Sequence, residues 1–199
     1  YNPCLIKAEE LHKIGCERLS KKVSSNSIEL VTVGRLIPSK NQLFLIELVK
    51  QLNIFSNLEY VLTVIGDGPD REKLTDYCTE LGIDESVTFL GWHDHPESIL
   101  ARSDIFVFSS LYEGFGNVLV EAISIGLPIV SFDCPYGPKE ILGESLSEQL
   151  CPINDMEAFI DRVEALGQNI SHRQKVTELC LKRSSEFDIN VIAHDYLNI

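Results

Sequence analysis

Several features of other protein classes are missing from this sequence. No stretch approaches the ~18 uninterrupted apolar residues that identify a membrane-spanning helix. The opening residues, Tyr1-Asn2-Pro3-Cys4, contain neither the basic region nor the apolar run of a signal peptide. The six cysteines are scattered without a C-x-x-C pair, which disfavours a disulfide framework or a structural zinc site. We therefore expect a cytoplasmic protein with reduced thiols.

Positive charge is also scarce. The chain has 17 Lys and Arg residues against 30 Asp and Glu residues, a formal net charge of −13 at pH 7. A surface of this kind repels polyanions, so we expect no nucleic acid among the partners. A small phosphorylated ligand would need a few basic groups placed locally. Arg35 and Lys40, close together after an apolar segment, are the candidates.

Apolar β-type runs alternate along the chain with segments of helical periodicity. The expected strands cover residues 28–34, 60–66, 87–90, 104–109, 128–132 and 149–152. The expected helices cover residues 41–52, 71–81, 96–101, 117–125, 155–166, 171–186 and 189–197. Because the strand runs are continuously apolar, both faces of their sheet must be covered. The expected fold class is therefore α/β, a Rossmann-like, doubly wound parallel sheet of about six strands with helices on both faces.

The loop after the first expected strand is one place where a ligand could bind. Ligands of open parallel sheets bind beyond the carboxyl ends of the strands. This loop runs from Gly34 to Asn41 and carries Arg35 and Lys40. Arg offers a planar fork to phosphate oxygens, Lys offers a point charge, and the helix that follows adds its N-terminal partial charge. The alternative is a solvated basic loop without a ligand.

A second loop, from Glu113 into a helix at Asn117, has different chemistry. Gly114 and Gly116 allow close backbone approach to a ligand, and the helix start offers free N–H groups. Glu113 could accept hydrogen bonds from sugar hydroxyls, and Glu121 could hold a ribose diol. From the residues alone, a flexible turn with two exposed glutamates is an equal alternative.

The remaining candidate segments carry less information. The turn Gly66-Asp67-Gly68-Pro69 could lie against a base or ribose, but such turns more often have no ligand. It is not a G-x-G-x-x-G fingerprint, which removes the main support for a nicotinamide cofactor. His93-Asp94-His95 lacks a third ligand, so a surface loop is favoured over a metal site. Trp92 could serve in packing or as a wall of a base pocket.

Taken in order, these motifs resemble family 4 of the retaining glycosyltransferases. The matching elements are G-R-x-x-P-x-K-N, G-D-G-P, F-L-G, S-S-x-x-E-G-F-G-x-x-x-x-E-A and G-x-P-I-V, within residues 28–142. The spacing between Glu113 and Glu121, E-x7-E with F-G inside, is the most specific of them. The resemblance implies one half of a GT-B fold, the C-terminal half that binds the sugar donor.

The resemblance also implies roles for individual residues. Arg35 and Lys40 would grip the donor diphosphate, and Glu113 would contact the donor sugar. Leu119 and Glu121 would lie against the nucleoside, with the glutamate holding ribose. The expected catalytic residues are Glu113, Arg35 and Lys40; the expected substrate-binding residues are these three with Gly34, Gly66, Gly114, Phe115, Gly116, Asn117, Val118, Leu119 and Glu121. No metal and no cofactor beyond the nucleotide-diphosphate sugar substrate are expected.

The family pattern divides the chain into two parts. Residues 1–27 would be the linker from an N-terminal domain, and residues 28–199 the donor-binding domain with a helical tail. The acceptor, a glycan or lipid-linked molecule, would bind through that other domain, with the full-length protein peripherally associated with the membrane. The fragment alone would be inactive.

One loop departs from the commoner G-G-x-x-E-x-I form. Its sequence, D-C-P-x-G-P-x-E-I over residues 133–141, resembles bacterial members that build lipid-linked glycans, lipopolysaccharide or capsule. UDP-sugars are therefore the favoured donors. The alternative function is a catalytically inactive nucleotide-sugar-binding module.

Overall fold

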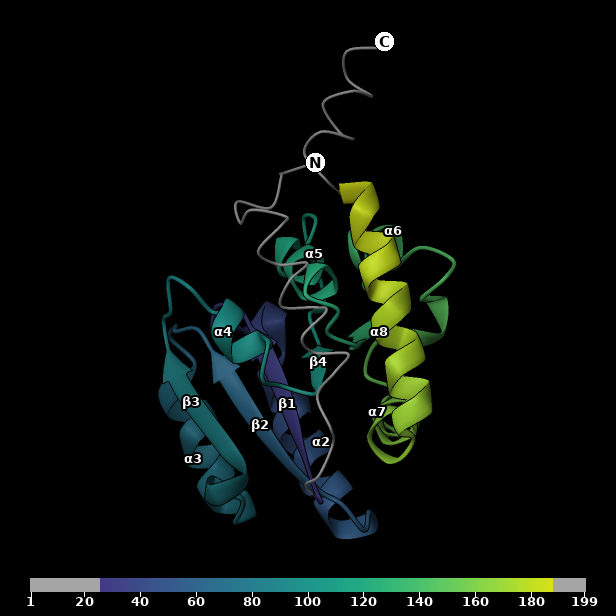
Figure 1. Ribbon diagram of the computed structural model, residues 1–199. Coiled ribbons are helices and arrows are strands. Elements are labelled where there is room, and N and C mark those ends of the chain that lie inside the picture. The colour runs from purple at the N-terminus through teal and green to yellow at the C-terminus, as the bar shows by residue number, and fades with distance from the viewer. Residues whose placement is uncertain (1–25, 188–199) are drawn as a thin grey trace.

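A computed structural model describes residues 26–187, which form one parallel sheet with helices on both faces (Figure 1). The strands are β1 (Ser27–Val33), β2 (Glu59–Ile65), β3 (Val87–Gly91), β4 (Ile105–Phe108), β5 (Ile129–Phe132) and β6 (Leu150–Cys151). Their order in the six-stranded sheet is β3-β2-β1-β4-β5-β6, and every neighbouring pair is parallel. The predicted doubly wound fold is confirmed.

The helices follow the strands in the expected alternation. They are α2 (Gln42–Phe55), α3 (Arg71–Leu81), α4 (Glu97–Leu100), α5 (Asn117–Ser124), α6 (Pro138–Leu142), α7 (Met156–Gln168) and α8 (Ile170–Ser184). Single 3-10 turns lie at η1 (Pro38–Lys40), η2 (Asp84–Ser86), η3 (Ser147–Gln149) and η4 (Ser185–Phe187). Where both exist, predicted and observed bounds differ by three residues or fewer. The helix expected over 189–197 lies outside the described residues.

Two local features differ from the sequence-based expectation. The helix predicted over 41–52, α2, does not begin at Asn41, because this residue has φ +53° and separates η1 from α2. Helix α6 was not predicted. It has only five residues and begins after Gly137 with Pro138, a combination that reads as a turn in the sequence.

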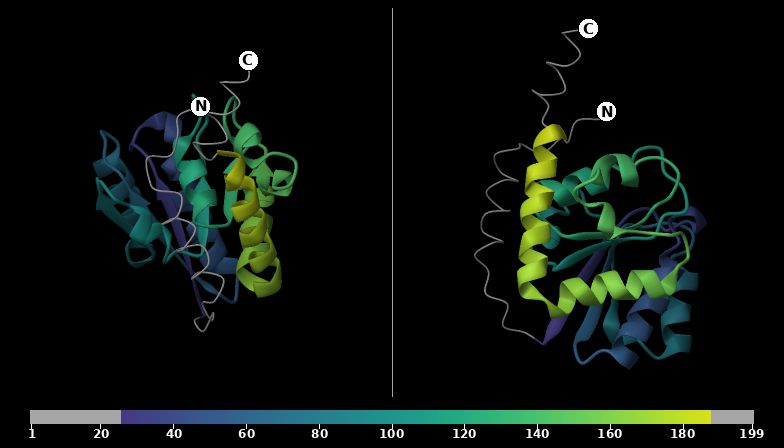
Figure 2. Two further views of the ribbon diagram at one scale, coloured as in Figure 1. Left: turned by 45° about the horizontal axis from the view of Figure 1, so that its top comes forward. Right: turned by 90° about the vertical axis from the view of Figure 1, so that its right-hand side faces the viewer.

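The core explains why the strand runs are continuously apolar. All residues of β4 and β5 are buried, because helices cover both faces of the sheet. On one face, Phe44 of α2, Phe132 of β5 and Phe159 of α7 pack edge to face, with ring centroids 4.6 to 5.5 Å apart. On the other, α5 packs against α8, which meets α7 at a corner (Figure 2). The sheet is thereby held between two helical layers.

The strand order places a switch point between β1 and β4. The chain leaves β1 toward α2 on one face and leaves β4 toward α5 on the other. Two loops therefore diverge at the carboxyl edge of neighbouring strands, which is where open α/β sheets bind ligands.

The thiols and the helices can be compared with the sequence-based expectations. Cys78, Cys134, Cys151 and Cys180 are buried free thiols, whereas the other two cysteines lie outside the described residues. No helix within residues 26–187 is long and apolar enough to span a membrane. The predicted linker over residues 1–27 falls almost entirely outside the described part and stays a prediction.

Candidate functional site

Hydrogen bonds join the loop after β1 to the loop after β4. The Ser109 hydroxyl lies within hydrogen-bonding distance of two carbonyl oxygens, 2.9 Å from that of Lys40 and 3.0 Å from that of Asn41. The Leu111 N–H donates to the Ser39 carbonyl at 2.8 Å. These bonds fix the two loops against each other at the switch point, although they are far apart in the sequence.

The side chains of Lys40 and Glu113 meet at this junction. The Lys40 ammonium donates to Oε1 of Glu113 and lies 5.9 Å from the centre of the Phe108 ring. The two side chains are 23% and 11% exposed, so water screens the pair only partly. Two of the three predicted catalytic residues are thus in contact, each neutralising the other. A ligand phosphate would have to compete with Glu113 for this ammonium.

Arg35 occupies the same loop in a different setting. Its side chain is exposed, and its carbonyl accepts a hydrogen bond from Nε2 of the buried Gln42 at 3.0 Å. Within residues 26–187 the Arg35 guanidinium has no ion-pair partner. The backbone of Arg35 is therefore fixed while its side chain remains available for an anionic ligand.

The Gly66-Asp67-Gly68-Pro69 turn packs directly beneath this first loop. A Cβ on Gly66 would lie 2.0 Å from the Gly34 carbonyl oxygen, and one on Gly68 would lie 2.3 Å from that of Leu36. The Leu36 N–H donates to the Asp67 carbonyl at 3.0 Å. The structure thus gives Gly66 a packing role, and its predicted contact with substrate stays a prediction.

The loop from Glu113 to Asn117 leads directly into α5. Gly116 has φ +91° and stands at the N-cap of the helix, while Gly114 and Asn117 are exposed. The first N–H groups of α5 therefore face the site at the carboxyl edge of β4. Phe115 and Val118 are half-buried, whereas Leu119 is fully buried and packs beneath Gly116.

A second layer of loop supports this segment. The Glu113 N–H points to the Pro135 carbonyl at 3.5 Å, a long hydrogen bond. Gly137, with φ +89°, approaches so closely that a Cβ would lie 1.8 Å from the Phe115 carbonyl oxygen. Helix α6 begins at the next residue, so its position and that of the Phe115 loop depend on each other.

Glu121 lies one helical turn further along α5. Burial raises the pKa of its carboxyl group, and the nearby charge of Glu97 in α4 raises it further. The sequence predicts that Glu121 holds a ribose diol. A carboxyl group with little water around it is suited to strong hydrogen bonds with hydroxyl groups.

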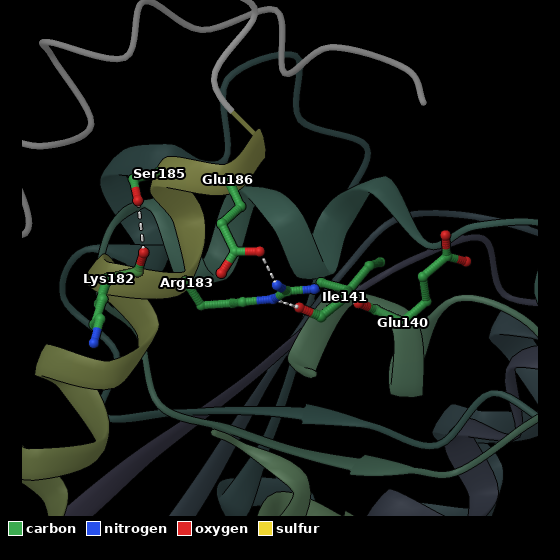
Figure 3. A network of polar contacts seen from close by, with 6 residues as sticks. All are labelled: Glu140, Ile141, Lys182, Arg183, Ser185 and Glu186. Carbon is green, nitrogen blue, oxygen red and sulfur yellow. Dashed lines mark hydrogen bonds and ion pairs between the residues drawn. The ribbon is translucent and has the colours of Figure 1, made fainter. Parts of the chain in front are cut away.

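Sequence reasoning missed a network at the end of α8 (Figure 3). Arg183 donates from Nε to the Ile141 carbonyl at 2.8 Å and from Nη2 to the Glu140 carbonyl at 2.6 Å. It also pairs with Glu186, and its guanidinium lies 5.1 Å from the centre of the Phe187 ring. These bonds satisfy carbonyl groups in the last turn of α6, which have no hydrogen-bond donor within the helix itself.

The network extends to the Phe115 loop. The rings of Phe187 and Phe115 have centroids 6.4 Å apart. The 3-10 turn η4, which follows α8, therefore contacts the loop directly, while Arg183 of α8 holds α6, which supports the same loop. Nothing in the local sequence signals this role, because a basic residue near a helix end is common on any surface helix.

Two further expectations concern the loop after β3. Trp92 is 75% exposed and donates from its indole nitrogen to Asp94 at 2.9 Å, so it is not a core residue. Within residues 26–187, no three His, Cys, Asp or Glu side chains gather as metal ligands would.

Comparison with known proteins decides the family. The family Glycosyl transferases group 1 matches residues 17–179, well over half of the chain. The chain belongs to this family.

The relatives of this chain include bacterial proteins and a protein of an archaeon. An uncharacterized glycosyltransferase of Methanocaldococcus jannaschii is 35% identical over 149 residues, covering 73% of this chain and 36% of that protein. The Campylobacter jejuni N-acetylgalactosamine-N,N'-diacetylbacillosaminyl-diphospho-undecaprenol 4-alpha-N-acetylgalactosaminyltransferase is 26% identical over 193 residues, covering 97% of this chain and 52% of that protein. An Escherichia coli UDP-Gal:alpha-D-GlcNAc-diphosphoundecaprenol alpha-1,3-galactosyltransferase is 34% identical, covering 68% of this chain and 35% of that protein. The chain thus spans about half the length of these relatives or less.

Solved structures match the fold with the same partial coverage. Staphylococcus aureus TarM superposes with a TM-score of 0.80 at 21% identity, over 89% of this chain and 36% of that one. Anabaena HepE, solved in complex with UDP, superposes with a TM-score of 0.78 at 20% identity, over 97% of this chain and 52% of that one. The described sheet is therefore one half of a GT-B glycosyltransferase fold.

Proposed function

We propose that this group 1 glycosyl transferase domain binds the UDP-sugar donor of a retaining glycosyltransferase. The observation that carries the proposal is the contact between Lys40 and Glu113 at the switch point of the sheet. A cation for phosphate and a carboxylate for sugar hydroxyls are needed side by side at the bond that joins diphosphate to sugar. This pair supplies both, beside the N-terminus of α5.

The proposed mechanism is stabilisation of the leaving diphosphate. When the sugar leaves, negative charge grows on the bridging and β-phosphate oxygens. Lys40, the exposed Arg35 and the free N–H groups at the start of α5 would supply positive charge to these atoms. The acceptor hydroxyl forms its bond to the anomeric carbon on the face from which the diphosphate departs, so the anomeric configuration is retained. The bond from sugar to diphosphate breaks in this step, and the departing phosphate oxygen takes the hydroxyl proton. This mechanism differs from that of glycoside hydrolases, which need two carboxylates flanking the bond.

The choice of UDP rests on relatives. The Escherichia coli relative is named for transfer from UDP-Gal, and Anabaena HepE was solved with UDP. Relatives are also named for acceptors that are diphospho-undecaprenol glycans or lipopolysaccharide. By analogy we propose a hexose or N-acetylhexosamine donor and a glycan or lipid-linked acceptor, with the full-length enzyme acting at the cytoplasmic face of a membrane.

Calorimetric titration of the chain with UDP, GDP and ADP tests the donor site. We expect UDP to bind most tightly of the three. Lys40→Ala should lower the affinity for UDP by about tenfold or more, since a charge-assisted hydrogen bond contributes ~1.5–3 kcal/mol. Glu113→Gln frees the ammonium, so UDP should bind at least as tightly while UDP-sugars lose affinity. Lys73→Ala, at an exposed position of α3, is the matched control for loss of one positive charge.

Two results would contradict the proposal. One is the absence of binding of all three nucleotides up to millimolar concentration. The other is an equal effect of the Lys40 and Lys73 substitutions.

In the full-length enzyme, Lys40→Ala and Arg35→Ala should each lower turnover by ~10²-fold, as loss of ~3 kcal/mol of charge stabilisation would. Nucleotide binding without turnover by the full-length wild type would favour the inactive binding module instead.

A further inference from the structure

Two exposed tyrosines stand together at the rim of the proposed donor site. Tyr112 and Tyr136 are 58% and 69% exposed, although large aromatic rings usually bury most of their surface. Their ring centroids are 6.0 Å apart in an edge-to-face arrangement. They come from different loops, one after β4 and one after β5, so the fold brings them together.

The backbone of Tyr136 is in an unfavourable conformation. Its φ of +65° lies in the left-handed region, which costs energy for any residue with a Cβ and is rare for bulky ones. Glycine would adopt it without cost. A costly conformation that brings a side chain to the surface beside a binding site suggests that the side chain has a function there.

The tyrosine pair directly adjoins the charged residues of the site. Tyr112 immediately precedes Glu113, and the Glu113 N–H points to the carbonyl of Pro135, the residue before Tyr136. The exposed rings therefore belong to residues whose backbone adjoins that of Glu113, the partner of Lys40. A sugar ring has the matching combination, an apolar C–H face and a rim of hydroxyl groups.

Resting on the proposed function, we propose that Tyr112 and Tyr136 form a platform for a pyranose ring. The ring belongs either to the donor sugar or to the terminal sugar of the acceptor, since both must meet at this edge. An anionic membrane surface is a poorer match, because the chain carries a net charge of −13.

The first arm of the test concerns the donor sugar. Calorimetry compares UDP with UDP-galactose and UDP-N-acetylglucosamine for wild type, Tyr136→Gly and Tyr136→Phe. If the platform holds the donor sugar, Tyr136→Gly leaves UDP affinity unchanged and weakens the UDP-sugar about fivefold, the effect of one aromatic contact. Tyr136→Phe keeps the ring and should bind as wild type does.

The second arm concerns the acceptor sugar. The chain saturated with UDP is titrated with the methyl glycosides of galactose and N-acetylglucosamine, followed by tyrosine ring signals in NMR spectra. If the platform holds the acceptor sugar, the shifts appear in wild type and disappear in Tyr136→Gly. Phe55→Ala, which removes another exposed aromatic ring at the far end of α2, is the control and should change neither arm.

Folding does not confound these measurements. Because Tyr136→Gly relieves the left-handed strain, its melting temperature should equal or exceed that of wild type, and a clear fall would show a structural role and overturn the proposal. Unchanged sugar binding in both arms, or none in wild type, would also overturn it, as would Tyr136-dependent binding only to phosphatidylglycerol vesicles. Failure of UDP itself to bind wild type refutes the donor site separately; the platform is then tested by titrating the chain with the same glycosides in the absence of nucleotide.

Discussion

Replacement of Gly137 by alanine tests whether α6 holds the Phe115 loop in place. The new Cβ would lie 1.8 Å from the Phe115 carbonyl oxygen, whereas Cβ contacts under 3.0 Å are essentially never found. One of the two backbones must therefore move by at least about 1.2 Å, the difference between these distances. The φ of +89° adds strain on the order of 1–3 kcal/mol for any residue with a side chain.

Both stability and binding should respond to this change. We expect Gly137→Ala to lower the free energy of unfolding by about 3 kcal/mol in urea titrations, since strain and clash act together. A displacement of about 1 Å in a positioning element can cost on the order of 10²-fold. UDP binding measured by calorimetry should therefore weaken by about tenfold or more.

Two other glycines provide matched controls. Gly82 has φ +67° and open space around its Cβ position, so Gly82→Ala isolates the left-handed strain of ~1 kcal/mol. Gly114 lies in the loop itself with open space and no positive φ, so Gly114→Ala should be nearly neutral for stability. If Gly137→Ala lowers the free energy of unfolding no more than Gly82→Ala does, and binds UDP as wild type does, the inference that α6 positions the loop is wrong.

The remaining predictions concern three side chains whose pKa is raised by burial and the hydrogen-bonded side chain of Arg183. Burial raises the pKa of the Glu121 carboxyl group, so the folded chain holds the proton of this group more tightly than the unfolded chain does. The protonated carboxyl group therefore contributes stability below pH 4.5, and this contribution is lost as the pH rises through the raised pKa of the folded chain. Glu121→Gln should therefore melt higher than wild type at pH 7, with the difference shrinking below pH 4.5, and should bind UDP more weakly; an unchanged or lower melting temperature at pH 7 would contradict the burial argument. Arg183→Met removes charged donors from the carbonyls of α6 and should lower the free energy of unfolding by about 2 kcal/mol in urea titrations. Lys182→Met in the same turn should lower it little, and equal losses would refute the role of Arg183 in holding α6. Burial raises the pKa of the Cys134 and Cys151 thiols to about 11, so their contribution to stability is lost as pH rises from 9.0 through that value. Iodoacetamide at pH 8 should alkylate both thiols much more slowly in the folded chain than in urea, as followed by mass spectrometry, and equal rates would disprove their protection.

The sequence predicts the sheet well because its signal is local. An uninterrupted apolar run such as 105–108 indicates a strand covered on both faces, and the structure buries every residue in it. Helix bounds follow from start and stop residues, as for α3, which ends where Gly82 adopts φ +67°. Helix α6 was missed because a helix of five residues that begins with Pro138, directly after Gly137, is too short to show helical periodicity.

The site is only half predictable for the opposite reason. The E-x7-E pattern and the basic pair mark two loops that the structure brings together, but the contact of Lys40 with Glu113 depends on β1 lying next to β4. The junction of Arg183 with Ile141 joins residues 42 positions apart, and the tyrosine pair joins two loops. Such contacts follow from three-dimensional packing and leave no periodic trace in the chain.

The bonds from Ser109 and Leu111 to Ser39 and Lys40 have a consequence for folding. They join the half of the sheet built from β1, β2 and β3 to the half built from β4, β5 and β6, and the binding surface includes both. Neither half alone would present a complete surface, so nucleotide binding reports docking of the two halves. At one hundred times its Kd, a ligand would stabilise the docked state by about 2.7 kcal/mol. A bound donor would thus stabilise the contact between the two halves of the sheet.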